Sequence, residues 1–341
     1  MELVPGISAH FVQSKKFKTN KITIRFTAPL SLETVAGRML SASMLETANQ
    51  AYPTSQAFRR YLASLYGTDI STSAYRRGQA HVLDLTFTYV RDEFLSKKNV
   101  LTSRILELVK QTLFAPLVQD GAFEPALFEI ERKQLLASLA TDMDDSFYFA
   151  HKELDSLFFH DERLQLRYSD LRNSISNESP ESSYTCFQDA LKNDRIDFFF
   201  LGDFNEVEVK EWLRSFSFTG RQIDVKPQYK QPYSNVLREG MVRKNVGQSV
   251  LELAYHCSTS YGDKHHLAMV VMNGLLGGFA HSKLFTNVRE NAGLAYTISS
   301  QLDLFSGQLR MYAGIDRGNR NQARKLMNHQ LLELKKGNFT D

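Results

Sequence analysis

A chain of 341 residues, 43% hydrophobic and 23% charged, is long enough for about two domains and too apolar to be disordered. Its formal net charge of +3 argues against nucleic acid as the main partner, and no apolar run approaches the roughly 20 residues of a membrane span. The two cysteines lie far apart without metal-binding spacing, and the N-terminus lacks a secretory signal, so we expect a cytoplasmic protein.

The first two hundred residues read as alternating helices and strands. Residues 21–30 alternate between polar and apolar side chains, which predicts a half-buried strand. An apolar stripe at helical spacing predicts a helix over 33–50, and Thr54 or Ser55 is expected to cap a second helix that Gly67 ends. The other expected elements are strands over 68–75 and 81–90, helices over 99–114, 124–140 and 146–158, a buried strand over 194–202 and a helix over 207–216.

A polar, proline-containing stretch then interrupts this order. Residues 226–232 are unlike a packed element, because two prolines flank polar residues there. We therefore expect an N-terminal domain over 1–220, a linker over 221–245 and a C-terminal domain over 246–341.

The order of elements restarts after the linker, which indicates an internal duplication. Ile24 and Leu251, Tyr66 and Gly293, and Leu85 and Tyr312 are landmark pairs, and each pair is 227 residues apart. The sequence therefore predicts two α+β domains of one topology. The second copy stops where the first finishes its third helix, so we expect a truncated C-terminal domain from a longer protein. The expected elements of this copy are strands over 249–257 and 308–315 and helices over 265–276 and 319–334.

The stretch over 275–299, LLGGFAHSKLFTNVRENAGLAYTIS, carries the most information. A glycine pair opens it, an amphipathic helix follows, Gly293 is suited to end that helix, and a strand comes next. Arg289 falls on the last turn of the helix and Tyr296 at the start of the strand. This order could bring both side chains to one edge of a sheet.

The pattern GG-x-x-x-S-K-L-F-x-x-V-R-E-x-x-G-L-A-Y resembles the C-terminal-half signature of the pitrilysin-type zinc peptidases, which include insulysin and the mitochondrial processing peptidase. The resemblance implies two repeated α+β domains, each an antiparallel-rich sheet with helices on one face. It also implies that Arg289 and Tyr296 bind substrate and stabilise the reacting carbonyl. The alternative is that Arg289 caps a helix and Tyr296 is a half-buried structural residue.

Active members of that family carry His-x-x-Glu-His on the first long helix and a further Glu on a later one. The equivalent positions here are Ser43, Glu46 and Thr47, and Ser138 stands at the later position. Hydroxyl groups are poor zinc ligands compared with imidazole or carboxylate, so we expect this chain to bind no zinc. Glu46 is then either an ordinary helix carboxylate or a vestige of the cleft.

Three functions remain open at this point. The resemblance favours a non-catalytic subunit of a heterodimer in which a homologous partner brings zinc and Arg289 and Tyr296 act in trans on a peptide. A peptidase active by itself is the second, and the lost ligands count against it. A non-enzymatic scaffold that binds peptides is the third.

Overall fold

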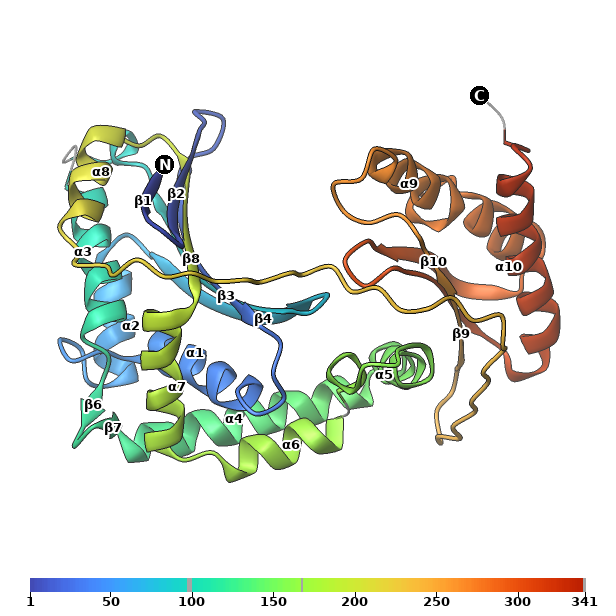
Figure 1. Ribbon diagram of the computed structural model, residues 1–341, viewed down its shortest axis with the longest axis horizontal. Helices are drawn as coiled ribbons and strands as arrows, with labels where there is room; N and C mark the ends of the chain where they lie inside the picture. Colours follow the sequence, from blue (N-terminus) through green and yellow to red (C-terminus); the bar gives the residue numbers. More distant parts are fainter. Residues whose placement is uncertain (97–99, 167, 340–341) are drawn as a thin grey trace. The chain divides into compact units, whose positions relative to one another are not determined.

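The computed structural model describes residues 1–96, 100–166 and 168–339 (Figure 1). These residues are α+β, as predicted, and their contacts divide the chain into two compact units. The domain boundaries expected at residues 220 and 246 stay a prediction. The first unit contains residues 1–76, 80–137 and 171–225, and the second contains 77–79, 138–170 and 226–341.

The first unit is built on a six-stranded sheet with the order β1-β2-β8-β3-β5-β4. The central strand β3 pairs antiparallel with both β5 and β8, whereas β2 and β8 run parallel. Alternation along β3 buries Ile22, Ile24 and Phe26, which is the pattern that the sequence predicts. The strands are β1 (Glu2–Val4), β2 (Ile7–Gln13), β3 (Thr19–Pro29), β4 (Asp69–Arg77), β5 (Ala80–Val90) and β8 (Arg195–Gly202).

Helices cover the apolar side of this sheet. Thr54 caps α2 as expected, because its hydroxyl accepts a hydrogen bond from the Ala57 backbone N–H at 3.1 Å. The helix expected over 99–114 begins at Leu101, and Asn99 lies outside the described residues. The helices that contribute to the core beneath the sheet are α1 (Val35–Thr47), α2 (Ser55–Ser64), α3 (Leu101–Phe114), α7 (Pro180–Asn193) and α8 (Glu206–Arg214). The division between the two units falls within α4 (Pro125–Asp144) and α6 (Tyr168–Asn177). The first unit also has the short turn η1 (Asp92–Phe94) and the small hairpin β6 (Val118–Gln119) and β7 (Ala122–Phe123).

The second unit has a three-stranded antiparallel sheet with the order β10-β11-β9. Its apolar core lies between this sheet and α10, while α5 packs against β9. Asp145 caps α5 by accepting from the backbone N–H groups of Phe147 and Tyr148. The elements are α5 (Ser146–Phe158), η2 (Glu162–Gln165), β9 (Ser249–His256), α9 (His266–Asn273), η3 (Gly274–Gly278), η4 (Phe285–Asn291), β10 (Ala295–Asp303), β11 (Gln308–Ile315), η5 (Arg317–Asn319) and α10 (Arg320–Lys335).

The two sheets share one strand order. Strands β3, β5 and β4 are neighbours in the first unit, and β9, β11 and β10 follow each other in the same way in the second. Tyr66 and Gly293, which are 227 residues apart, both adopt a left-handed backbone, with φ of 56° and 61°. The register slips by one residue: Ile24 faces Leu85, but Leu251 faces Ala313 rather than Tyr312. The internal repeat is therefore present in the topology, with one residue of offset in the second strand.

Between α8 and β9 the described chain has no helix or strand, in agreement with the polar stretch found in the sequence. None of the helices among the described residues is long and apolar enough to cross a lipid bilayer.

Candidate functional site

The helix α1 carries three of the four positions where the resemblance places zinc chemistry. Glu46, at the position of the general base, turns its carboxylate to Thr72 on β4. Its Oε2 accepts from the Thr72 backbone N–H at 2.9 Å and from the Thr72 hydroxyl at 2.6 Å. The carboxylate therefore fastens the helix to a strand, which fits a structural role.

Thr47 and Ser43 hold hydroxyl groups where an active relative has histidines. The Thr47 hydroxyl lies 3.0 Å from Oε1 of Glu131 on α4 and 2.9 Å from the Ser43 carbonyl oxygen. Burial raises the pKa of Glu131, the Thr47 hydroxyl opposes that rise by donating to the carboxylate, and the charge of Glu46 adds to it. A carboxylate held by a hydroxyl is a satisfied buried group rather than the beginning of a metal site.

Ser138, at the fourth position, is exposed on α4. Within the described ranges, no group of three or more His, Cys, Asp or Glu residues is arranged to hold a metal ion. The residues that are present thus do not fit a zinc ion, since two hydroxyls and an exposed serine replace its ligands.

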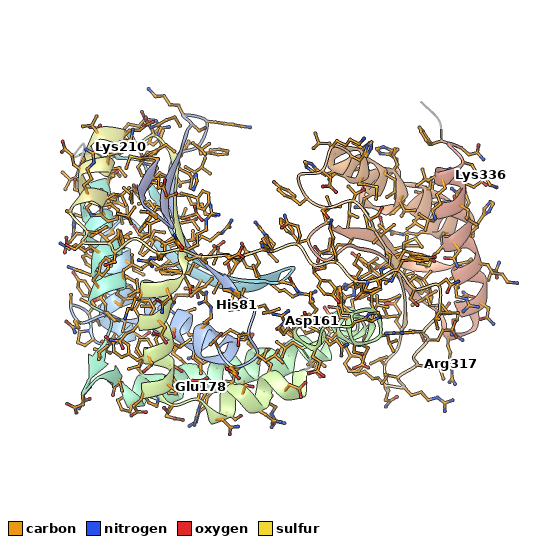
Figure 2. All side chains as sticks on the ribbon, viewed as in Figure 1. His81, Asp161, Glu178, Lys210, Arg317 and Lys336 are labelled. Atoms are coloured by element: carbon orange, nitrogen blue, oxygen red, sulfur yellow. The ribbon has the colours of Figure 1, made fainter. Side chains whose placement is uncertain are left out.

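A buried polar cluster beside these positions anchors α1. Arg38 donates from Nε to Nδ1 of His81 at 2.7 Å, and its Nη1 lies 2.6 Å from Oδ2 of Asp194 (His81 is labelled in Figure 2). Burial, assisted by the Arg38 charge, lowers the pKa of His81 to about 3. His81 is therefore a neutral acceptor at physiological pH, and the cluster is structural.

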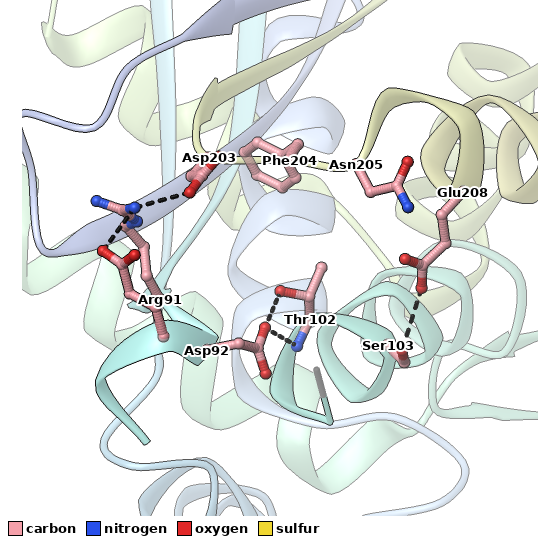
Figure 3. Close-up of a pocket in the computed structure, with 9 residues that line it drawn as sticks. Arg91, Asp92, Thr102, Ser103, Asp203, Phe204, Asn205 and Glu208 are labelled. Carbon is pink, nitrogen blue, oxygen red and sulfur yellow. Dashed lines mark hydrogen bonds and ion pairs between the residues drawn. The ribbon is translucent and has the colours of Figure 1, made fainter. Parts of the chain in front are cut away.

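A hollow of 330 Å³ between the ends of β5 and β8 has a polar lining (Figure 3). Its charged groups bind one another: Nη2 of Arg91 lies 2.7 Å from Asp203 and 2.6 Å from Glu93. Asp92 caps α3 by accepting from the backbone N–H groups of Leu101 and Thr102. The Ser103 hydroxyl donates to Oε1 of Glu208 at 3.3 Å. These contacts hold the loops and the starts of the helices together.

The glycine pair before the Arg289 helix allows a close approach to β10. A Cβ atom on Gly277 would lie 2.5 Å from the backbone nitrogen of Ser300, so no other residue fits there without a shift. The Gly277 carbonyl also accepts from the Ser299 hydroxyl at 2.9 Å. The turn η3 therefore fixes the position of β10.

Arg289 lies on η4, a segment that is wound as a π-helix. Such segments are rare in proteins overall, but many of them occur at functional sites. The guanidinium is exposed and stacks over the Phe285 ring, 4.6 Å from its centroid. Among the described residues no carboxylate forms an ion pair with Arg289 within 4.0 Å. The backbone carbonyl of Arg289 accepts from Gly293, which turns the chain into β10.

Tyr296 is the extra residue of a β-bulge at the start of β10. Ala295 pairs with Ile315 and Thr297 with Gly314, so Tyr296 has no partner of its own. A bulge re-aims side chains, and here both Tyr296, 63% exposed, and Thr297 point to solvent. The sequence contains no signal for this bulge. The structure thus places both predicted residues on the surface of the second unit, near the edge strand, as donors without a partner carboxylate.

Comparisons with known proteins agree with the fold. The sequence profile described as "Peptidase M16 inactive domain" matches residues 177–341. A Bacillus subtilis protein named a probable inactive metalloprotease, YmfF, is 28% identical over 98% of this chain and 79% of its own. A conserved protein from Enterococcus faecalis V583 has a crystal structure that superposes with a TM-score of 0.89, at 33% identity over 100% of this chain and 80% of that one. The peptidase M16 inactive domain from Pseudomonas fluorescens, at 17% identity, shares the fold with a TM-score of 0.78 over 97% of this chain and 77% of that one.

Proposed function

This chain belongs to the M16, or pitrilysin-type, family of peptidases, and on that premise we propose that it is a non-catalytic subunit that binds peptide for a zinc-bearing partner. One observation carries the proposal. The zinc-ligand positions carry hydroxyl groups: that of Thr47 is hydrogen-bonded to Glu131, and Ser138 is exposed. Arg289 and Tyr296, in contrast, are accessible near an edge of the second sheet.

Arg289 and Tyr296 would supply the donors in this scheme. An arginine without a carboxylate partner can donate charge-assisted hydrogen bonds to a carbonyl oxygen or to the oxyanion that forms from it. The Tyr296 hydroxyl is a second donor, and the bulge presents it to solvent rather than to the sheet. Two donors aimed at one developing charge stabilise the transition state more than the ground state, which is the condition for catalysis.

The homologous partner would supply what this chain lacks. Its zinc would polarise the scissile carbonyl and lower the pKa of an attacking water, and its own glutamate would take the water proton. Glu46 of this chain does not fit that task, because the backbone N–H and the hydroxyl of Thr72 both donate to its carboxylate. The proton transfers therefore belong to the partner and the binding of the peptide backbone to this chain.

The edge of the second sheet suits an extended peptide. β10 is an outermost strand of the sheet and pairs with β11, and Tyr296 is its second residue. A peptide that adds as a strand to β10 would make main-chain hydrogen bonds there, with little dependence on sequence. Such binding would bring its carbonyl groups along a line that begins at Tyr296.

Mixing tests the proposal. The purified chain is combined with a zinc-bearing M16 homologue from the same host, and cleavage of a quenched fluorescent peptide is followed. We expect cleavage by the mixture that exceeds that of either chain alone and that a zinc chelator abolishes. Zinc-dependent cleavage by this chain alone would establish an independent peptidase. No gain on mixing would favour a peptide-binding scaffold, for which the stacking of Arg289 on Phe285 is the supporting contact.

We place this activity in the cytoplasm. Cys186 and Cys257 are both free thiols, as a reducing compartment allows. Cell fractionation with an antibody against the chain checks this, and recovery from the extracytoplasmic fraction would contradict it.

A further inference from the structure

The loop between β2 and β3 in the first unit is rich in lysine and carries one aromatic residue. It reads Ser-Lys-Lys-Phe-Lys over residues 14–18, and the Lys21 side chain on β3 is exposed just after it. The loop projects at one end of the six-stranded sheet, where it is drawn in dark blue (Figure 1). Phe17 is 48% exposed, although aromatic rings normally lie largely inside a protein.

A buried arginine holds the backbone of this loop in place. Arg91, only 2% exposed, donates from Nη1 to the carbonyl oxygens of Lys15 at 3.2 Å and Phe17 at 3.0 Å. Its backbone N–H donates to the Lys18 carbonyl oxygen at 3.0 Å. Because one residue fixes three carbonyl groups of the loop, binding through the loop's side chains would cost little backbone entropy.

The lysine side chains of the loop have no acidic partner. Among the residues that the structure describes, no carboxylate forms an ion pair within 4.0 Å with any of these lysines. The carboxylates of Glu93 and Asp203 bind Arg91 instead, at 2.6 Å and 2.7 Å (Figure 3). The Lys16 ammonium lies 5.7 Å from the centre of the Phe17 ring. We define the lysine loop by its exposed side chains, which are Lys15, Lys16, Phe17, Lys18 and Lys21.

The surroundings of the lysine loop favour a flat anionic surface as its partner. The hollow lined by Arg91 is a poor site for an anion, because its other charged residues are Asp92, Glu93, Asp203 and Glu208. A projecting loop does not enclose an acidic peptide. A nucleic-acid site usually belongs to a strongly basic domain, whereas the net charge of this chain is only +3. Lysines around an exposed aromatic ring are typical of segments that lie on a membrane.

We propose that the lysine loop docks the chain on a lipid bilayer that contains anionic lipids. The Phe17 ring enters the boundary between headgroups and acyl chains, and the four ammonium groups lie at the level of the lipid phosphates. Each lysine near such a surface strengthens binding about fivefold, so the docking is reversible. The proposal does not rest on the function proposed above, because neither Arg289 nor Tyr296 belongs to the lysine loop.

Flotation with lipid vesicles tests this. The 341-residue chain is mixed with vesicles of phosphatidylcholine and phosphatidylglycerol, or of phosphatidylcholine alone, and the bound fraction is measured. We expect binding to the anionic vesicles only, and its loss in about 1 M salt. Lys15→Gln with Lys16→Gln should weaken the binding about 25-fold, since each lysine accounts for about fivefold. Phe17→Ser should weaken it at least about threefold, because less apolar surface leaves water.

Lys110→Gln with Lys133→Gln is the matched control. It removes the same charge at two exposed positions on α3 and α4 of the same unit, and it should leave the binding nearly unchanged. All of the substituted side chains are exposed, and circular dichroism verifies that the variants are folded. Equal binding to both kinds of vesicle, no binding, or an equal loss in this control would overturn the proposal.

Phe17→Trp distinguishes a bilayer from other anionic partners. Its fluorescence should shift to shorter wavelength when anionic vesicles are added, because the indole leaves water. Double-stranded DNA and poly-glutamate, added at the same salt concentration, should bind more weakly and cause no such shift. Tighter binding to DNA or to poly-glutamate would overturn the proposal, since the lysine loop would then belong to a nucleic-acid or an acidic-protein interface.

Discussion

The hydroxyl of Thr47 donates to the carboxylate of Glu131, 3.0 Å away, at a helix position where an active relative would carry a zinc-binding histidine. Burial raises the pKa of Glu131, so its ionised form is costly in the folded state and depends on this donor. Thr47→Val should therefore lower the free energy of unfolding by about 1–3 kcal/mol at pH 7.

The pH dependence identifies the cause. A carboxyl whose folded pKa is raised destabilises the fold once pH exceeds its unfolded pKa, so the loss in Thr47→Val should shrink near pH 4. Urea unfolding measures this loss of free energy at each pH. Fluorescence of Trp212 reports the transition, because Trp212 is the one tryptophan and lies in the first unit. Thr47→Ser, which keeps the hydroxyl, is the control and should behave as wild type. An equal loss at both pH values would mean that packing, not the hydrogen bond, is responsible.

The metal content of the chain should follow the side chains at the ligand positions. We expect the protein, purified without chelator, to contain far less than one zinc per chain by elemental analysis, because Ser43, Thr47 and Ser138 offer no strong ligand. Ser43→His with Thr47→His creates two imidazoles one helical turn apart. This variant should gain zinc-dependent thermal stability, which the wild type lacks. Stoichiometric, tightly held zinc in the wild type would contradict this prediction.

Much of the fold could be predicted because its strongest local signals agree with its tertiary contacts. The alternation in β3 and the stripe in α1 are patterns of burial, and both are found where expected. β1, β2 and α6 were not predicted. α7 carried a start signal that could have been used: Ser179 and Ser182 cap it reciprocally, and Pro180 is its first residue.

The role of the candidate site residues stays a prediction, and their conformation could not be predicted from the sequence. The motif singles out Arg289 and Tyr296, and both lie exposed near an edge strand. The bulge at Tyr296 depends on how β10 pairs with β11, which no pattern within β10 alone encodes, and the π-winding of η4 was not predicted either. The one-residue slip in the register of β11 has the same origin, since the pairing of strands is set by their shared core.

His81 should make the first unit sensitive to acid. Its pKa is lowered from 6.5 to about 3 in the folded state. Between these two pH values the imidazole is therefore protonated in the unfolded chain and neutral in the folded chain. The stabilisation is therefore complete above pH 6.5 and is lost at about 1.4 kcal/mol per pH unit as the pH falls toward 3. His81→Asn keeps an acceptor for Arg38 and should flatten this dependence between pH 7 and pH 4.5. Urea unfolding followed by Trp212 fluorescence measures the free energy of unfolding at each pH. His329→Asn, at an exposed histidine of α10, is the control and should leave the pH dependence unchanged.

The last prediction concerns the action of Arg289 and Tyr296 in trans. Tyr296 is 63% exposed and unpaired at a bulge, so Tyr296→Phe should leave the melting temperature nearly unchanged. If the hydroxyl donates to the reacting carbonyl, cleavage by the assembled complex should slow by about 10²–10³, the usual effect of one lost oxyanion donor. Arg289→Ala should slow it as much or more, because a charged donor is the stronger one. Its loss of stability should stay within about 1 kcal/mol, since its contact with Phe285 is a cation–π stack at the surface.

Thr297→Val is the matched control, because Thr297 is the exposed neighbour of Tyr296 on the same bulge and has no role in the proposal. The zinc-bearing partner must be saturating, so that weaker assembly is not mistaken for slower chemistry. Under that condition a lower kcat with an unchanged partner affinity places the two donors at the substrate. Full activity of both Tyr296→Phe and Arg289→Ala would refute the action in trans. A loss of melting temperature that accounts for the lost activity would instead assign both residues to the fold, and a peptide-binding scaffold would then be the better description of this chain.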